Sequence, residues 1–157
     1  MAGITGARPR LAGIELGGTK CIAALGEGER IVDRHVFPTT TPHETLGAAL
    51  AALRNWHDAS PLAAIGLASF GPIRVNPAAA DYGTILATPK PGWRGAQVLA
   101  GIRRTFQLPI AIDTDVNAAA LAEHAHGAAQ GCSNTVYLTI GTGLGGGVLI
   151  DGHPVHG

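Results

Sequence analysis

Residues 110–117 read Ile-Ala-Ile-Asp-Thr-Asp-Val-Asn, and an alanine-rich run, Ala-Ala-Ala-Leu-Ala-Glu, follows over residues 118–123. The first three residues are typical of a short buried strand, and the run after Asp115 predicts a helix because alanine is the best helix former. Asp113 and Asp115 therefore lie at a strand-to-helix junction. A carboxylate there can cap the helix by accepting free backbone N–H groups. It can equally project into the crevice where open α/β sheets place ligands, and this stretch alone leaves both interpretations open.

Upstream of this junction, the sequence predicts an antiparallel meander of strands. Three β-prone runs, over residues 11–16, 21–25 and 31–37, are separated by short turns that contain glycine. Short connections of this kind favour antiparallel pairing of neighbouring strands.

A helix with an explicit start signal follows the meander. Thr41 is predicted to cap this helix, Pro42 to occupy its first position, and Glu44 to complete a capping box with Thr41. Ser60 and Pro61 are predicted to end it. Apolar residues recur at helical spacing and predict one buried face, which consists of Leu46, Ala49, Leu50, Leu53 and Trp56.

Two further strands are reached through helical crossovers, which favours parallel pairing. An apolar run over residues 64–68 predicts a buried strand. A short strand over residues 84–87 and a helix over residues 96–106 are expected before the strand at residues 110–112. The predicted fold class is therefore α/β with a mixed sheet.

Beyond the alanine-rich helix, the pattern of the first two strands returns. Gly127 and Gly131 break the helix, and residues 135–140 form a strongly β-prone run. Residues 141–147, Gly-Thr-Gly-Leu-Gly-Gly-Gly, are interpreted as a glycine turn, and residues 148–150 as the returning strand.

The repetition of a strand, a glycine turn and a strand predicts two similar domains. We expect a loose leader over residues 1–10 and a small α/β domain over residues 11–132. Residues 133–157 would begin a larger second domain that is truncated after its first hairpin.

The composition argues against several classes of protein. The chain has 157 residues, zero net formal charge and no basic run that would indicate nucleic-acid binding. The apolar run near the N-terminus is short and contains Glu15, so it predicts neither a signal peptide nor a membrane span. Cys21 and Cys132 are far apart, and they are predicted to be reduced, packed thiols of a cytoplasmic protein.

The two glycine turns are candidates for anion binding. Glycine lets backbone N–H groups approach an anion closely and can adopt positive φ, and successive N–H groups can form an anion-binding nest. The first turn, over residues 17–20, adds a hydroxyl and a cation, although an ordinary hairpin turn is the alternative. Residues 141–146 also match the spacing of the dinucleotide-binding fingerprint, but that fingerprint requires a helix to follow, and the strand-like residues 148–150 exclude it.

Two glycine turns with a carboxylate junction between them imply a phosphoryl-transfer cleft between two domains. The chain resembles the N-terminal part of a sugar kinase of the ROK family, within the actin, hexokinase and heat-shock protein superfamily of ribonuclease-H-like folds. Five motifs in the right order carry the resemblance and span nearly the whole chain from residue 11 onward. They are Gly-Ile-Glu-Leu-Gly-Gly-Thr-Lys (13–20), Ala-Ser-Phe-Gly-Pro-Ile (68–73), Thr-Pro-Lys-Pro-Gly-Trp (88–93), Asp-Thr-Asp-Val-Asn (113–117) and Thr-Ile-Gly-Thr-Gly-Leu-Gly-Gly-Gly (139–147). The first and third look most like the bacterial fructokinase branch.

The resemblance implies a role for most of these motifs. Asp115 matches the catalytic base, which accepts a proton from the sugar hydroxyl that attacks the γ-phosphorus of ATP, with Mg²⁺ as the metal cofactor. Sugar contacts are implied for Gly71, Pro72, Thr114 and Asp115. Contacts to the ATP phosphates are implied for Glu15, Gly17, Gly18, Thr19, Lys20, Gly141, Thr142, Gly143 and Gly145.

Two positions depart from the family pattern. Many members have Asp where this chain has Glu15, which weakens the expectation of an acidic contact to a Mg²⁺-bound water. Many have Asn where this chain has Thr114. A threonine hydroxyl can still bind a sugar, and this form occurs in the fructokinase branch, so the glucose-specific pattern is disfavoured.

The histidines do not form a metal site in the sequence pattern. Five are scattered, and we interpret them as surface or capping residues: His35, His43, His57, His124 and His126. His153 and His156 lie near residue 157 without a cluster of cysteines or carboxylates. The zinc-binding Cys/His cluster of the family would lie after Gly157.

The sequence therefore predicts the N-terminal part of a kinase that phosphorylates a free hexose, with fructose giving fructose 6-phosphate. The longer parent is expected to form a homodimer, and this chain alone is expected to be inactive. One alternative is a remnant that binds sugar or phosphate without turnover. A sugar-responsive regulator is disfavoured, because such ROK proteins carry a helix-turn-helix domain before the kinase-like part.

Overall fold

The computed structural model describes residues 8–141 and 143–156. The expected leader thus falls mostly outside the described residues, as does Thr142. The elements in chain order are β1 (Arg10–Leu16), β2 (Lys20–Glu27), β3 (Arg30–Pro38), α1 (Pro42–Ala59), β4 (Ala64–Ser69), α2 (Ala100–Thr105), β5 (Ile110–Thr114), α3 (Asp115–His126), β6 (Thr135–Ile140), β7 (Leu144–Ile150) and β8 (His153–Pro154).

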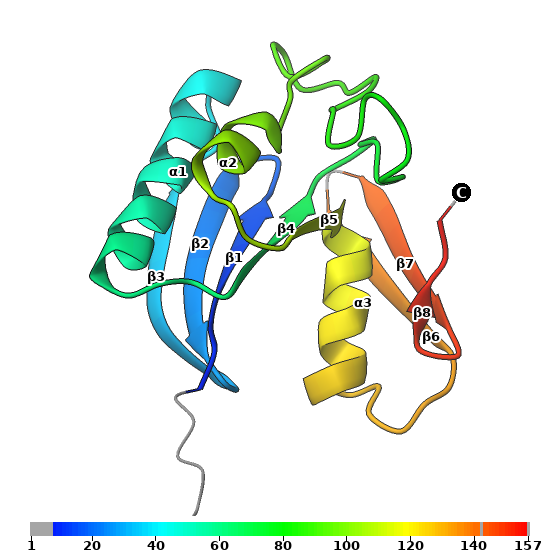
Figure 1. Ribbon diagram of the computed structural model, residues 1–157. Helices are drawn as coiled ribbons and strands as arrows, with labels where there is room; N and C mark the ends of the chain where they lie inside the picture. The colour runs from blue at the N-terminus through cyan, green and yellow to red at the C-terminus, as the bar shows by residue number, and fades with distance from the viewer. Residues whose placement is uncertain (1–7, 142, 157) are drawn as a thin grey trace, which may run out of the picture.

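A mixed five-stranded sheet in the order β3-β2-β1-β4-β5 forms the larger part of the molecule (Figure 1). β1, β2 and β3 pair antiparallel, as the glycine turns predicted. β4 and β5 join the other side of β1 in parallel, as predicted from the helical crossovers. The α/β fold class is confirmed.

Helices α1 and α2 cover one face of this sheet. Alternate side chains of β1 and β2 point toward α1 and are buried with its apolar stripe. The predicted capping box is present, since Thr41 Oγ1 accepts a hydrogen bond from the Glu44 backbone N–H (3.3 Å) and the Glu44 carboxylate accepts one from the Thr41 N–H (3.5 Å). The core beneath the helix consists of Ala12, Ile14, Leu16, Cys21, Ala23, Leu25, Ala49, Leu53 and Trp56.

The predicted helix over residues 96–106 is wrong at its start, because α2 begins only at Ala100. Residues 96–98 are instead paired with the preceding loop: the Ile85 N–H donates to Ala96 O (3.0 Å), and the Val98 N–H donates to Gly83 O (2.9 Å). These hydrogen bonds compete with helix formation. The strand expected over residues 84–87 is reduced to isolated bridges at Thr84 and Ile85.

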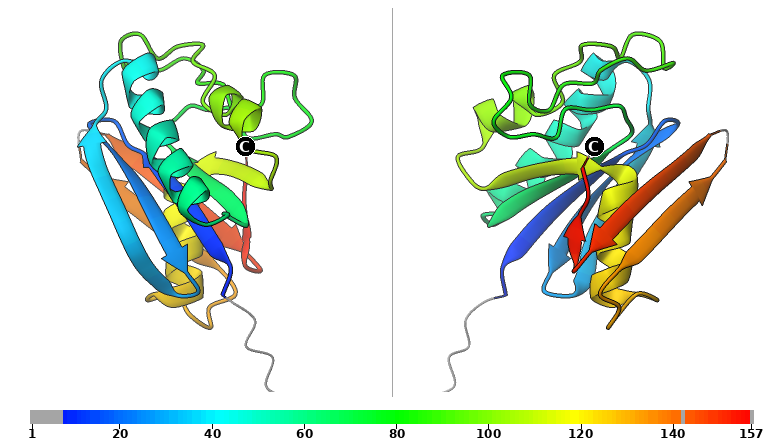
Figure 2. Two further views of the ribbon diagram at one scale, coloured as in Figure 1. Left: turned by 60° about the vertical axis from the view of Figure 1, so that its left-hand side comes forward. Right: turned by 90° about the vertical axis from the view of Figure 1, so that its right-hand side faces the viewer.

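A second, three-stranded sheet, β6-β7-β8, lies on the other side of α3 (Figure 2). β7 begins at Leu144, so the glycine run at 145–147 belongs to a strand, and the predicted long glycine turn is shorter than expected. Helix α3 contacts β6 and β7 as well as β4 and β5, and therefore lies between the two sheets.

The two cysteines differ in environment. Cys21 is buried, and burial together with the charge of Glu15 raises the pKa of its thiol to about 12. Cys132 is exposed, so the prediction of a packed thiol is wrong there; it lies in the turns that follow α3. Within residues 8–141 and 143–156, no helix is long and apolar enough to cross a membrane.

Candidate active site

The carboxyl ends of the parallel strands β1, β4 and β5 meet at one edge of the larger sheet. Their register places Glu15, Ala68 and Asp113 side by side in one row. The first glycine turn follows β1, Gly71 and Pro72 follow β4, and Asp115 follows β5. The candidate residues of three motifs, 13–20, 68–73 and 113–117, therefore gather at the edge where α/β sheets bind ligands. The motif at residues 88–93 has no site role implied by the resemblance.

The junction after β5 resolves which residue caps helix α3. Thr114 is the cap, because its Oγ1 accepts a hydrogen bond from the Asn117 N–H (3.2 Å). Asp113 Oδ1 accepts from the Thr114 N–H (2.7 Å) and from the buried Asn117 Nδ2 (2.9 Å). Neither aspartate is the helix cap, and Asp115 is the first helical residue.

Asp115 is half-buried, and its carboxylate accepts few hydrogen bonds. Its Oδ1 accepts from the Val116 N–H (2.9 Å), and no side chain among the described residues donates to it. Burial, the largest cause, and the negative charge of Glu15 raise the pKa of Asp115, while the backbone N–H groups of Val116 and Asp115 oppose this rise. A raised pKa makes a carboxylate a stronger base, which suits proton abstraction.

His156 contacts the same junction, which the sequence analysis did not anticipate. Its Nε2 lies 2.8 Å from Asp113 Oδ2, and the side chains are 44% and 18% exposed. The contact ties the end of the chain to the end of β5. The two residues are 43 positions apart, so no local spacing could have revealed the pair.

The first glycine turn is a tight hairpin turn with a steric reason for glycine. The Gly17 N–H donates to Lys20 O (3.0 Å). A Cβ on Gly17 would lie 2.8 Å from that same oxygen, whereas a Cβ on Gly18 would meet nothing within 4 Å. Neither glycine has positive φ, so close approach of the backbone, rather than a left-handed conformation, explains Gly17.

The second glycine segment divides into a turn and a packing surface. In the turn, the Gly141 N–H donates to Gly143 O (2.9 Å), and a Cβ on Gly143 would meet nothing within 4 Å. Gly145 lies in β7, where a Cβ would be 2.9 Å from Val116 Cγ1. A Cβ on Gly147 would collide with the Val116 carbonyl. These two glycines thus let β7 lie directly against the helical turn that carries Asp115.

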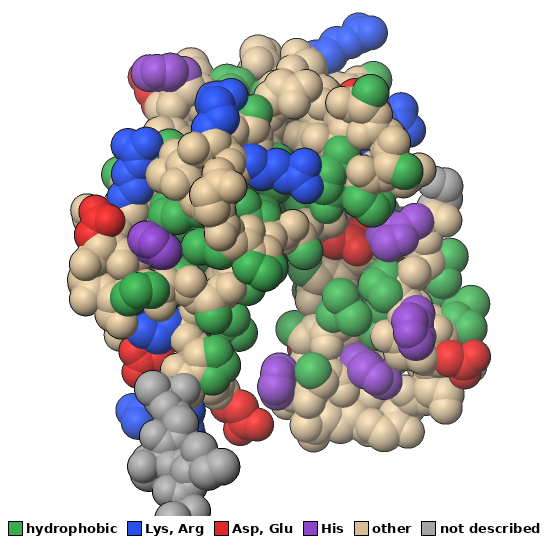
Figure 3. All heavy atoms as spheres, in the orientation of Figure 1, with side chains coloured by type: hydrophobic (Ala, Val, Ile, Leu, Met, Phe, Trp, Pro, Cys, Tyr) green, Lys and Arg blue, Asp and Glu red, His purple; other side chains and the backbone are tan. Residues whose placement is uncertain are grey.

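A groove of about 340 Å³ runs between the larger sheet and α3. Its walls are small or apolar, including Gly13, Ala24 and Ala118, with Glu15 among them. Figure 3 shows the open space between the two halves of the molecule. A groove of about 410 Å³ between α1 and α2 has none of the candidate site residues in its lining.

Metal binding by protein ligands alone finds no support in the described residues, which include no group of three or more His, Cys, Asp or Glu able to hold an ion. Glu15 and Asp115 nevertheless lie close enough for the charge of one to raise the pKa of the other. A cation between them would relieve this repulsion, and Mg²⁺ commonly uses one or two carboxylates with phosphate oxygens and waters. The residues present therefore fit a Mg²⁺ ion that takes its other ligands from phosphate and water.

Strand order, helix placement and the carboxylate at the β5–α3 junction define the ribonuclease-H-like α/β fold of the actin and hexokinase class. The structure is similar to a ROK family glucokinase from Streptomyces griseus solved with glucose and AMPPNP, with a TM-score of 0.79 and 29% identity over 94% of this chain and 46% of that chain. It is also similar to a ROK hexokinase from Thermus thermophilus, with a TM-score of 0.77 and 33% identity over 94% and 49% of the two chains.

The chain belongs to the ROK family, whose profile matches residues 11–157. It is 47% identical over 151 residues to a fructokinase from Zymomonas mobilis, covering 92% of this chain and 49% of that protein. A fructokinase from Pediococcus pentosaceus is 44% identical over 148 residues, covering 94% and 50%. The chain thus spans about half the length of the relatives it matches.

Proposed function

We propose that the protein containing this chain is an ATP-dependent sugar kinase that phosphorylates a free hexose, with fructose giving fructose 6-phosphate. The observation that carries the proposal is Asp115, a half-buried carboxylate with a raised pKa at the ligand-binding edge of the sheet. Similarity to fructokinases of Zymomonas mobilis and Pediococcus pentosaceus supports fructose as the substrate.

In this proposal, Asp115 accepts the proton of the sugar hydroxyl as its oxygen bonds to the γ-phosphorus. The bond from that phosphorus to the bridging oxygen breaks, and ADP leaves. A positioned base contributes about 10²–10⁴-fold in rate. Gly71 and Pro72 contact the sugar, and the Thr114 hydroxyl donates to it, because the oxygen of that hydroxyl already accepts from Asn117.

The two glycine turns bind the phosphates of ATP. Glu15 would hold Mg²⁺ through bound water, which leaves Asp115 free to act as the base, and the ion would neutralise phosphate charge. The remaining rate enhancement comes from positioning by the turns. The phosphate contacts in this proposal come from Glu15, Gly17, Gly18, Thr19, Lys20, Gly141, Thr142, Gly143 and Gly145.

We assign residues 11–132 to a small domain and residues 133–157 to the start of a larger one, which supplies the rest of the sugar and adenine contacts. The parent protein would be a cytoplasmic homodimer, with any zinc cluster outside this chain. Catalysis by positioning needs both walls of the cleft, so the 157-residue chain alone should not turn over.

The test joins this chain to the C-terminal half of the Zymomonas mobilis fructokinase and couples ADP release to a spectroscopic readout. Fructose, glucose and mannose are compared, each with wild type and Asp115→Asn. We expect fructose-dependent turnover that falls about 10²-fold or more in the variant, with ATP affinity little changed. Near-normal kcat would overturn the role of Asp115 and make Asp113 the next candidate, whereas sugar binding without turnover would favour a binding-only remnant.

A further inference from the structure

The Thr-Pro-Lys-Pro-Gly-Trp turn at residues 88–93 has no role in the function proposed above. It lies against the first glycine turn, although the two are far apart in sequence. Lys90 Nζ donates to Gly18 O (2.5 Å) and to Thr39 O (3.2 Å), across 72 and 51 positions respectively. A cation thus sits behind the turn that is proposed to bind phosphate.

Lys90 projects from a backbone that is firmly held. Trp93 is fully buried, and its Nε1 donates to Thr40 O (2.9 Å). Its ring meets Phe70 edge-on, with centroids 5.2 Å apart. The Lys90 N–H donates to Thr88 Oγ1 (3.3 Å), and Lys90 O accepts from the Trp93 N–H (3.3 Å). The turn is therefore a rigid support from which the lysine side chain reaches the glycines.

Three successive carbonyls of the glycine turn are held by two residues, Thr39 and Lys90. Gly17 O accepts from Thr39 Oγ1 (2.8 Å), Gly18 O from Lys90, and Thr19 O from the Thr39 N–H (2.9 Å). The only cis peptide bond among the described residues is at Gly71–Pro72, so these peptides are trans. In a planar trans peptide, the C=O and the N–H of the next residue point in opposite directions.

The Gly18 N–H is consequently turned away from Thr39, and the Thr19 N–H is turned away from Lys90. Neither donates to an acceptor within the part of the chain that the structure describes. Two successive outward N–H groups make a concavity suited to an anion. Their direction depends on what holds Gly17 O and Gly18 O on the opposite side.

We propose that Lys90 is a positioning residue for the first glycine turn: by holding Gly18 O, it directs the Thr19 N–H at a phosphate of the nucleotide. The inference rests on the proposed function for the identity of that anion. Without Lys90, the peptide between Gly18 and Thr19 has little to prevent its rotation, since Gly18 carries no side chain and has open space around it. Rotation would present a carbonyl oxygen, which repels an anion.

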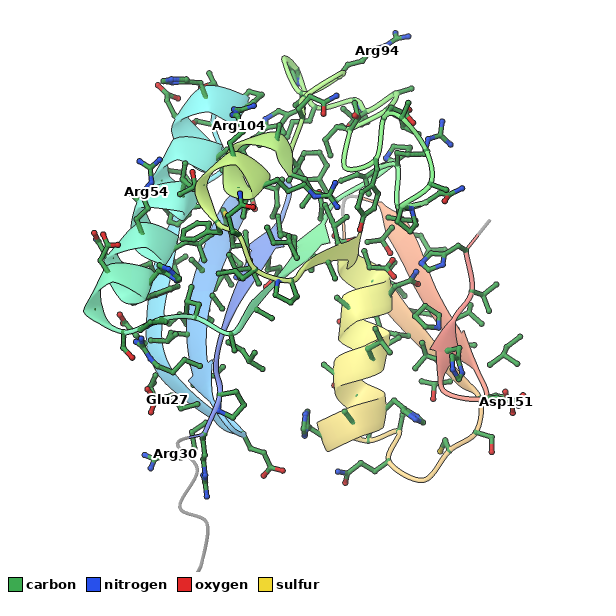
Figure 4. The ribbon with its side chains drawn as sticks, in the orientation of Figure 1. Glu27, Arg30, Arg54, Arg94, Arg104 and Asp151 are labelled. Carbon is green, nitrogen blue, oxygen red and sulfur yellow. The ribbon has the colours of Figure 1, made fainter. Side chains whose placement is uncertain are left out.

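The first experiment measures the direction of the Thr19 N–H in the 157-residue chain, without any ligand. Residual dipolar couplings are compared among wild type, Lys90→Met and Lys90→Arg, with Arg94→Met as the matched control. Arg94 is a cation of the same loop, but it points out from the molecule (Figure 4). We expect the Thr19 coupling to fall by about half or more in Lys90→Met and to stay unchanged in Arg94→Met, as expected when only the former removes a charge-assisted bond.

The second experiment titrates the same four proteins with inorganic triphosphate and then with ATP. We expect affinity to fall about tenfold in Lys90→Met, the scale of one lost charge-assisted hydrogen bond, and to recover partly in Lys90→Arg. If affinity falls while the Thr19 coupling is unchanged, Lys90 contacts the phosphate directly and the proposal is overturned. If the coupling falls but wild type binds no triphosphate, the phosphate role of the turn is overturned and the hold of Lys90 on the turn is supported.

A third measurement uses the wild-type chain, so it tests the proposal even if a variant does not fold. In the wild-type chain, an ammonium held by two carbonyls should give a slowly exchanging Lys90 NH₃⁺ signal by NMR, and absence of that signal overturns the proposal. Thr39→Val offers an independent check, because it removes the bond to Gly17 O and should disturb the Gly18 N–H rather than the Thr19 N–H. If either variant lowered the couplings of the Gly18 and Thr19 N–H groups equally, Thr39 and Lys90 would not each orient one N–H group, and the proposal would be contradicted.

Discussion

The hairpins β1–β2 and β6–β7 share one sequence design but differ in what covers them. In β1–β2, one face is buried beneath α1, and the other carries small residues such as Gly13 and Ala24. In β6–β7, one face packs on α3, and the other exposes large apolar side chains. The exposed fractions on that face are Val136 64%, Leu138 58%, Ile140 81%, Leu144 74% and Ile150 54%.

This difference shows that a repeated local pattern does not imply repeated stability. β1–β2 is the middle of a five-stranded sheet with a helix over its core. β6–β7 belongs to a three-stranded sheet whose outer face lacks a cover within the described residues. A hairpin gains independent stability only by packing against further strands or helices. The stability of β1–β2 therefore comes from its own sheet and α1, whereas the stability of β6–β7 depends on packing against α3.

The largest expected contrast comes from truncating one leucine in each region. Leu53 on α1 is fully buried over β1–β2, whereas Leu138 on β6 is exposed. Leu53→Ala should lower the unfolding free energy by about 2–5 kcal/mol through lost burial and a cavity. Leu138→Ala should change it by no more than about 0.5 kcal/mol. Urea unfolding followed by tryptophan fluorescence measures both, and a similar loss in the two variants would contradict the comparison.

A smaller contrast is expected from adding a methyl group to one glycine in each hairpin. A Cβ on Gly147 would collide with the Val116 carbonyl, whereas a Cβ on Gly13 meets nothing within 4 Å. Gly147→Ala should cost about 1–3 kcal/mol by overpacking and should separate β7 from α3. Gly13→Ala should be neutral or gain up to about 1 kcal/mol, because glycine is unfavourable in a strand. Hydrogen exchange at β7 amides reports the separation, and unchanged protection in Gly147→Ala would show that α3 does not support this hairpin.

Much of the fold follows from short-range signals in the sequence. The meander, the capping box at Thr41 and the parallel strands β4 and β5 were predicted because turn chemistry, helix capping and crossover geometry act locally. The start of α2 was not, since residues 96–98 form hydrogen bonds with residues 83–85 that override helical periodicity. The start of β7 was missed because a glycine run looks like a turn unless its partner strand is known.

The site residues that belong to a single sequence motif could be predicted from the sequence. Contacts between segments that are distant in sequence could not. Glu15 lies near the carboxyl end of β1, and Gly71 and Asp115 follow β4 and β5, so topology alone places them at one edge. That Thr114 rather than an aspartate caps α3 depends on side-chain geometry at neighbouring positions. The contacts of His156 with Asp113 and of Lys90 with Gly18 span 43 and 72 positions, and no periodicity encodes such pairs.

Asp115 begins α3, the helix between the two hairpins, and we expect its buried charge to lower the stability of the folded chain. Burial, and then the charge of Glu15, raise its pKa in the folded chain above the ordinary value of 3.8. The folded state therefore disfavours the carboxylate, and Asp115 lowers stability at neutral pH but not below its ordinary pKa. Asp115→Asn should thus be more stable than wild type near neutral pH, by less than about 1 kcal/mol. The gain should disappear as the pH falls through the raised pKa toward 3.8.

Asp33 on β3 provides a control of opposite sign for this prediction. Its hydrogen bond from Trp56 Nε1 (2.7 Å), and then one from the Arg34 N–H, lower its pKa. Asp33 should therefore stabilise the folded chain above its ordinary pKa, and this stabilisation should be lost as the pH falls. Urea unfolding at neutral and acidic pH compares both Asn variants. If Asp115→Asn were less stable than wild type at neutral pH, burial of the Asp115 carboxylate would not lower the stability of the folded chain.

The bare face of β6–β7 is tested most directly by single-residue changes that have the smallest expected effect on stability, combined in one variant. Replacing Val136, Leu138 and Ile140 together by threonine keeps the β-propensity of the strand while removing exposed apolar surface. The unfolding free energy should stay within about 0.5 kcal/mol per substitution, because these side chains are already in contact with water. Wild type should self-associate and bind a hydrophobic dye through this face, and the triple variant should do so far less. Tyr137→Thr is the matched control: its residue pairs with Gly147 on the face toward α3, so it should lower stability without reducing association. Sedimentation velocity and dye fluorescence measure the outcome. A monomeric wild type that binds no dye would show that the outer face is not adhesive, and the two hairpins would then differ only in their support from α1 and α3.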